Sequence, residues 1–292
     1  MLPILDQLNA QISLLIAGTT PQLTAFSWFL FNAIAVSQLV MISIRWELEL
    51  MDNQHWPRLH IAEVFSFLLK LGVVGTLLTF YTSALPGFGV NVHQVLPLIG
   101  QKLAASVNQS GDAAMTNSLN NAIANVPSPS LLNPIEIVTY AVVLLVTGLF
   151  HLLMFVVTAF GFIAVGVLSL TGQLVIPLLL TKHFAKYFWG WVDMMFTYSM
   201  YPFIGAAFIF VFSNSVNNFF VNAFAGGFTF VQLVLTFPVM CVLLGTFAFS
   251  IFKVPEFAAQ HFGGAGATFA GLAGVAQKYL VSAVEAAAFR AF

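Results

Sequence analysis

Residues Ser169–Phe208 read SLTGQLVIPLLLTKHFAKYFWGWVDMMFTYSMYPFIGAAF in one-letter code, and they hold two apolar runs separated by a basic and aromatic band. The band covers residues 181–193, and its charged and aromatic members include Lys182, His183, Lys186, Tyr187, Trp189, Trp191 and Asp193. Lys and Arg are enriched on the cytoplasmic side of a bilayer, while Trp and Tyr concentrate at headgroup depth. The pattern predicts two membrane spans joined at the cytoplasmic face.

The composition of the whole chain points the same way. Of the 292 residues, 60% are hydrophobic and only 7% are charged, whereas soluble domains carry roughly 25% charged residues. No soluble fold could bury so much apolar surface, so we expect an all-α polytopic transmembrane protein. The net charge of -1 gives no overall attraction for nucleic acid. The single cysteine, Cys241, excludes an internal disulfide framework, and we expect it to be a small buried residue.

About five spans are predicted, near residues 23–44, 59–82, 194–212 and 228–252, with one more between 135 and 181. The last of these stretches is about twice as long as one span needs. One interpretation is a span near 135–160 followed by a tilted or interfacial helix near 161–180, with Gly172 and Pro177 permitting a bend. The rival interpretation is two full spans.

The rest of the chain divides around these spans. We expect an amphipathic interfacial helix over 1–20 with a new helix starting at Pro21, two spans within 21–82, and a periplasmic helical loop over 83–134. Short helices are expected in that loop near 92–107 and 113–124. Residues 135–256 hold the three further spans, with polar residues 213–218 as a connection, and 257–292 form a Gly/Ala-rich helical cytoplasmic tail.

The distribution of basic residues predicts the orientation. With five spans, one side of the membrane receives Arg45, Arg58, Lys182, Lys186, Lys253, Lys278 and Arg290, and the other receives Lys102. The positive-inside rule then places the N-terminus and the 83–134 loop in the periplasm and the C-terminus in the cytoplasm. A sixth span would separate Lys182 from Arg45, which favours five. The first 20 residues lack a basic n-region, so no cleavable signal peptide is expected.

Few side chains within the spans carry chemistry. Lys70 lies inside the second span, where a charge costs roughly 2.5–3.5 kcal/mol; it either faces a bundle interior, a partner or water, or snorkels to the interface. Glu63 is expected to be solvated at the cytoplasmic edge, and His151 to make an interhelical hydrogen bond. Trp189 and Trp191 are expected to be interfacial anchors. The motifs H-E-x-x-H, G-x-x-x-x-G-K-[ST] and G-x-S-x-G do not occur, so we expect no enzyme activity, metal or cofactor.

The segment Leu170–Trp191 resembles the signature of the TrbL-type polytopic subunit of type IV secretion (conjugal transfer) systems. Gly172 stands for the family's early glycine, Lys182 and Lys186 for its basic patch, and Gly190 and Trp191 for its Gly-Trp pair. Gln173 occupies the position where the family pattern leads us to expect proline, and Pro177 comes later.

The resemblance implies a channel or scaffold subunit of the bacterial inner membrane that supports pilus assembly and the passage of DNA or protein substrates. It implies a ring of identical subunits, with a pentamer as a candidate size, in contact with pilus subunits, other inner-membrane secretion proteins and ATPases. Contact with single-stranded DNA would be transient, because the 83–134 loop lacks dense positive charge. The candidate functional residues are Lys70, Lys182, Lys186, Gly190 and Trp191. A secondary transporter or other permease is the alternative.

Overall fold

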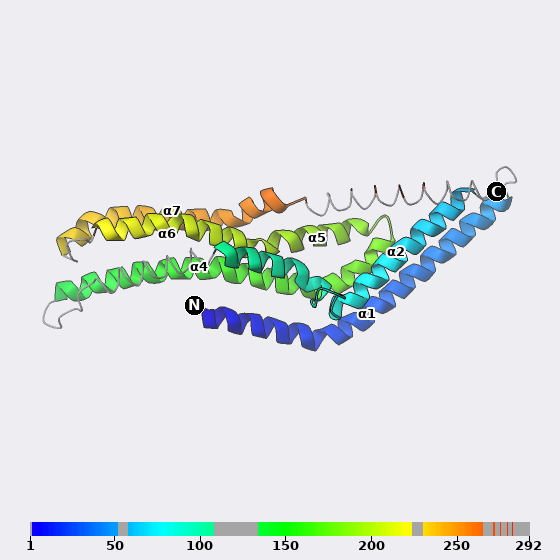
Figure 1. The fold of residues 1–292 in the computed structure, drawn as a ribbon, viewed down its shortest axis with the longest axis horizontal. Helices are drawn as coiled ribbons and strands as arrows, with labels where there is room; N and C mark the ends of the chain where they lie inside the picture. The colour runs from blue at the N-terminus through cyan, green and yellow to red at the C-terminus, as the bar shows by residue number, and fades with distance from the viewer. Residues whose placement is uncertain are drawn as a thin grey trace. The chain divides into compact units, whose positions relative to one another are not determined.

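A computed structural model describes residues 2–51, 58–107, 134–223 and 230–264, together with residues 271, 275, 279 and 282 of the tail. Within these ranges every regular element is a helix (Figure 1). They are α1 (Leu2–Met51), α2 (Arg58–Thr82), a helix over 92–107, α4 (Pro134–Val175), the 3-10 helix η1 (Ile176–Leu180), α5 (Ala185–Ser199), α6 (Tyr201–Ala223) and α7 (Phe230–Phe262). The all-α prediction is confirmed.

Five helical segments are long and apolar enough to cross a bilayer, as expected. They are Gly18–Leu48, Glu63–Thr82, Ala159–Leu180, Ala185–Phe212 and Val234–Phe262. The prediction of a polytopic membrane protein is therefore confirmed, although several boundaries differ from those expected.

The N-terminal region differs first, because α1 runs unbroken from Leu2 to Met51 with Pro21 inside it. The expected helix start at Pro21 is therefore wrong. A proline inside a helix removes one backbone hydrogen bond and commonly bends it, and Figure 1 shows a bend in the N-terminal half of α1. In an apolar environment a broken helix would leave several more backbone groups unpaired, which favours continuing through the proline.

The long apolar stretch after residue 134 forms one helix, α4, of 42 residues. At 1.5 Å per residue it is about 63 Å long, roughly twice the thickness of a hydrocarbon core. The span that qualifies here is Ala159–Leu180, later than the expected 135–160. Among the described residues no second full span is found in this stretch. The helix changes to 3-10 geometry at Ile176, next to Pro177, which has no N–H to donate.

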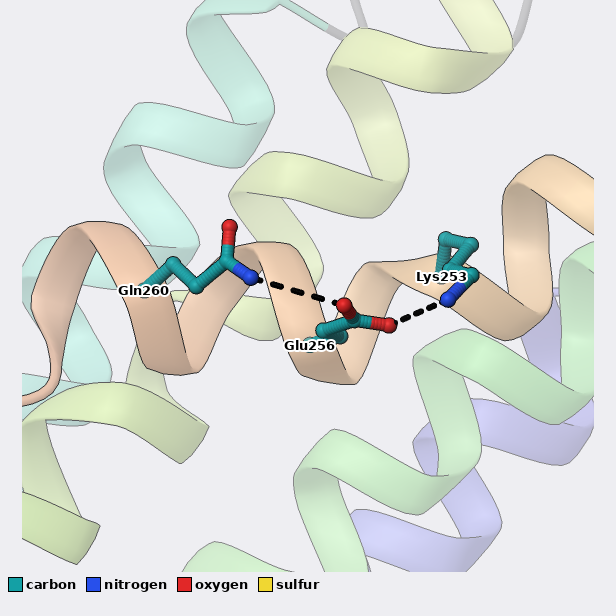
Figure 2. Close-up of polar contacts among 3 residues, drawn as sticks. All are labelled: Lys253, Glu256 and Gln260. Atoms are coloured by element: carbon teal, nitrogen blue, oxygen red, sulfur yellow. Dashed lines mark hydrogen bonds and ion pairs between the residues drawn. The ribbon is translucent and has the colours of Figure 1, made fainter.

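Two other expected helix ends are wrong. α6 continues through residues 213–218 to Ala223, and α7 continues past Lys253 and Pro255 to Phe262. Figure 2 shows how α7 accommodates its charges: Lys253 pairs with Glu256 one turn away, and the Gln260 amide donates to the same carboxylate. The paired charges offset the cost of continuing the helix. The helix over 92–107 is confirmed, whereas the predicted helix over 113–124 and most of the tail lie outside the described residues.

The chain divides into two compact units, which are described separately. The first comprises Met1–Leu8, Pro97–Ala164 and Thr197–His261. Its interior holds Phe150, Phe212 and Phe247, with Phe247 in ring contact with each of the other two at 5.2 Å. At the α5–α6 junction, a Cβ added to Gly100 would lie 2.8 Å from the carbonyl carbon of Ser199 and closer still to its oxygen. The 92–107 helix therefore packs with its backbone directly against this junction.

The second unit comprises Asn9–Leu96, Val165–Phe196 and Phe262–Phe292, and it contains the signature segment up to Phe196. Here α1 and α2 form a helical hairpin (Figure 1), with the Arg45 guanidinium 3.3 Å from the Glu63 carboxylate. α2 also packs on η1. This unit holds four of the five candidate functional residues on the loop and helix that follow η1, and the fifth on α2.

Candidate functional site

Three helices meet at two hydrogen bonds in the second unit. The Tyr81 hydroxyl at the end of α2 donates to the Ser169 carbonyl of α4 at 2.6 Å. The indole Nε1 of Trp191 on α5 donates to the neighbouring Leu168 carbonyl at 2.9 Å. The two rings lie 6.4 Å apart, and Tyr81 and Trp191 are only 1% and 7% exposed. We call this arrangement, together with Gly172, the Tyr81–Gly172–Trp191 interlock.

Gly172 occupies the space between the two rings. A Cβ added there would lie 2.8 Å from Cε2 of Trp191 and closer still to the Tyr81 hydroxyl oxygen. Both obstacles are held by hydrogen bonds to the same helix, so neither side chain can move away without losing its bond. The early glycine of the signature is therefore required for close packing of three helices.

The interlock corrects one expectation from the sequence. Trp191 was expected to anchor at the membrane interface, but its ring is buried and its N–H is bonded within the protein. Trp189, two residues earlier, is partly exposed and contacts the Phe188 ring edge-on at 5.1 Å. Neighbouring tryptophans on a helix face different directions, which composition alone does not reveal.

Gln173 connects a fourth helix to this site. Its side chain is 3% exposed, and its Oε1 accepts a hydrogen bond from the Thr24 hydroxyl of α1 at 2.9 Å. The proline expected from the signature would have no amide to make this contact. The departure from the signature thus has a structural use, because it fixes α1 against the end of α4.

An apolar cavity of about 370 Å³ adjoins Trp191. Its walls come from α2, the chain that follows α2, η1 and α5, and they are made of Leu77, Leu85, Val92, Val95, Leu96, Ile176, Phe188, Trp191, Val192 and Met195. Such a lining suits hydrocarbon and offers nothing to coordinate an ion.

The basic candidates separate into two groups. Lys70 on α2 is partly buried; α2 packs on η1, and Lys182 is the second residue after η1 ends. Lys186 is exposed and lies over the ring of Tyr187, with 5.2 Å between its Nζ and the ring centre. Gly190 is also exposed, and a Cβ added there would meet nothing within 4 Å. The structure therefore places Lys70 and Lys182 on neighbouring elements, whereas Lys186 and Gly190 lie on the exposed side of α5.

Two polar contacts were missed by sequence reasoning. Asp193 on α5 accepts a hydrogen bond from the backbone N–H of Gly264 at 2.6 Å, where Gly264 has a φ of 88°. This bond ties the end of α7 to α5. His93 Nδ1 lies 2.7 Å from the Tyr81 carbonyl and donates to it, and burial lowers the pKa of His93 despite that bond. The only sequence signal for either was a polar residue beside an apolar run.

Other expected features are placed as follows. Glu63, expected to be solvated, is paired with Arg45 and only partly exposed. Cys241, expected to be buried, is exposed on α7. The His151 side chain lies outside the described residues. In the described part of the chain no group of three or more His, Cys, Asp or Glu side chains is placed to hold a metal ion.

Residues 55–254 match the family model described as TrbL/VirB6 plasmid conjugal transfer protein. The chain belongs to this family. The match covers α2 to α7 except for the last turns of α7, so it includes the whole Tyr81–Gly172–Trp191 interlock as well as Lys70 and Lys182. It leaves out Thr24. A search of curated proteins found no match.

Membership of the TrbL/VirB6 family, with the five apolar helices, makes the chain a multi-pass bacterial membrane component of conjugal transfer by type IV secretion. The family is a structural component of conjugation and is not known for enzymatic activity. The resemblance seen in residues 170–191 is confirmed.

Proposed function

We propose that this TrbL/VirB6 protein is an inner-membrane channel or scaffold subunit that supports pilus assembly and the passage of DNA or protein substrates. The observation that carries the proposal is that the signature residues build the interlock: Gly172 and Trp191 fix the crossing of α2, α4 and α5 and present no reactive group. Signature residues whose role is to fix helix packing are expected in a rigid structural subunit of a membrane assembly.

The exposed surface of the helices supports assembly into a ring of identical copies. Half of an apolar 18-residue stretch of the Ala185–Phe212 span is buried within the protein, compared with 22% of such a stretch in Gly18–Leu48, 22% in Glu63–Thr82 and 17% in Val234–Phe262. The side chains on these three spans that remain exposed are largely apolar, and they need lipid or other subunits to cover them.

The cavities favour a scaffold role within each copy. The cavity beside Trp191 and a smaller one lined by Val146, Phe150, Phe219, Met240 and Leu243 both have apolar walls. DNA or an unfolded polypeptide requires a polar, hydrated path. A conduit would therefore form between copies or with partner proteins, which we expect to be pilus subunits, other inner-membrane secretion proteins and ATPases. We further propose a periplasmic 83–134 loop and a cytoplasmic tail.

The test is complementation of a host from which the gene has been deleted. Wild-type protein and the Gly190→Ala variant should restore plasmid transfer and pilus formation, whereas Gly172→Leu, which cannot fit the interlock, should not. Protein purified into lipid nanodiscs should form a ring of several copies by mass. The proposal would be contradicted, and a transporter supported, if the purified protein were a monomer that binds a small solute saturably and if deletion of the gene left plasmid transfer unchanged.

A further inference from the structure

Lys70 and Lys182 are two cations that lie on neighbouring elements of the second unit. α2, which carries Lys70, packs on η1, and Lys182 is the second residue after η1 ends. Lys70 is partly buried and lies within the Glu63–Thr82 span. Tyr81 bonds to Ser169 and Leu77 lines the same cavity as Ile176, so earlier residues of α2 lie against later residues of the chain, in the direction of Lys182. Two positive charges are therefore held near each other where hydrocarbon is close.

No carboxylate balances these charges within the described ranges. Glu63 lies seven residues before Lys70, about 10 Å along the helix axis, and its carboxylate pairs with Arg45. Among those same residues, neither Lys70 nor Lys182 makes an ion pair or hydrogen bond. A cation inside a membrane segment is already costly, and a neighbouring like charge raises that cost. Within the described residues, the arrangement leaves both charges available to an added anion.

We propose that Lys70 and Lys182 bind the phosphate group of an anionic phospholipid. Lys70 lies about 10 Å from the end of its span, and its four-carbon stem brings the ammonium several ångströms closer to headgroup depth. Beside Lys182, Phe184 and Tyr187 are exposed by 50% and 54% with their rings stacked, as expected for side chains at the interface. The N-terminus of α5, three residues after Lys182, adds the positive end of a 15-residue helix dipole.

The lipid is favoured over free phosphate because one member of the pair, Lys70, lies within an apolar span. Lys70 lies between the apolar residues of a span, where a lipid can place its phosphate and bury its acyl chains at once. Lys186 is not part of the site, since its ammonium lies over Tyr187. The proposal does not depend on the secretion role, because it concerns only how the protein binds its membrane.

The experiment uses the full-length protein in a neutral detergent. Phosphatidylglycerol, phosphatidylcholine or inorganic phosphate is titrated, and the thermal midpoint is followed for wild type and for Lys70→Gln, Lys182→Gln and Lys186→Gln. Lys186→Gln is the matched control, because it removes the same charge from the same band. Lys70→Gln and Lys182→Gln should each lower the apparent affinity for phosphatidylglycerol about fivefold relative to wild type, the factor expected for about 1 kcal/mol per basic residue. Lys186→Gln should leave the affinity within twofold of wild type.

Three results would overturn the proposal. Equal stabilisation by phosphatidylcholine would show that the phosphate site does not select anionic lipid. Equal stabilisation by inorganic phosphate would assign the site to a soluble anion. An equal loss in Lys186→Gln would reduce the effect to general surface charge. Lys182 is exposed in a turn, so Lys182→Gln tests the site even where Lys70→Gln does not fold.

Discussion

Replacing Gly172 with alanine tests whether the signature glycine is there for packing. The added methyl would lie 2.8 Å from Cε2 of Trp191 and closer to the Tyr81 hydroxyl, so both rings must move. Overpacking costs about 1–3 kcal/mol, and the loss of two hydrogen bonds costs about 1 kcal/mol each. Alanine recovers about 1 kcal/mol through its better helix propensity. The net expectation is a destabilisation of about 2–4 kcal/mol.

The control is the other signature glycine. A methyl added at Gly190 meets nothing within 4 Å, so Gly190→Ala should gain up to about 1 kcal/mol from helix propensity alone. The assay is thermal unfolding in detergent with tryptophan fluorescence as the signal, because Trp191 reports on the interlock directly. The expected midpoints fall for Gly172→Ala and hold or rise for Gly190→Ala. Equal midpoints for the two variants would refute the packing argument.

Three further predictions follow from the same unit. Tyr81→Phe should cost about 1 kcal/mol of stability, because it loses the hydrogen bond to Ser169. It also removes the hydroxyl oxygen that a methyl at Gly172 would meet, so the Tyr81→Phe, Gly172→Ala double variant should lose less stability than the two single variants added together. Additive losses would contradict this coupling. Burial lowers the pKa of His93 below 6.5, so the unfolded chain takes up the proton first as the pH falls, and the stability that His93 contributes should be complete above about pH 6.5 and decline below it. His93→Gln should therefore reduce the pH dependence of the unfolding midpoint between pH 5 and 7. An unchanged pH dependence would count against this role of His93. Asp193→Ala should remove the hydrogen bond from Gly264 and speed proteolysis near the end of α7, whereas Asp193→Asn keeps an acceptor and should be cleaved at the wild-type rate. Identical cleavage rates in all three proteins would show that this hydrogen bond does not hold the segment in place.

Sequence reasoning succeeded where one physical effect dominates. Charged residues are so scarce that lipid had to be the solvent, and the number of spans followed from the lengths of the apolar runs. The residues of segment 170–191 were enough to indicate the family. Helix ends were less predictable, because Pro21, Pro255 and the polar residues 213–218 interrupt the pattern without ending the helix. Within a membrane, unpaired backbone groups cost more than these residues do.

The candidate site was predicted only in part, because its geometry depends on contacts between distant helices. Trp191 was identified, but its buried position depends on the Leu168 carbonyl 23 residues earlier and on Tyr81 from another helix. Lys70 and Lys182 are far apart in sequence, and only the packing of α2 on η1 brings them together. Gly190 has the same residue type as Gly172 but has open space around it, and Lys186 is exposed like Lys182 but lies over the Tyr187 ring. Residue type and spacing could not separate these pairs.

We expect lipid to solvate most of these side chains, with the basic aromatic band facing the cytoplasm and the middle loop facing the periplasm. The most direct test is labelling of single cysteines by a membrane-impermeant maleimide, in a Cys241→Ser background. The exposed residues Lys102, His183 and Tyr279 suit the substitutions, whereas Gly100 does not, because a side chain there would collide with Ser199. We predict that Lys102→Cys is labelled in intact spheroplasts, and that His183→Cys and Tyr279→Cys are labelled only after the membrane is opened. The reverse pattern, or labelling of all three from outside, would contradict the account.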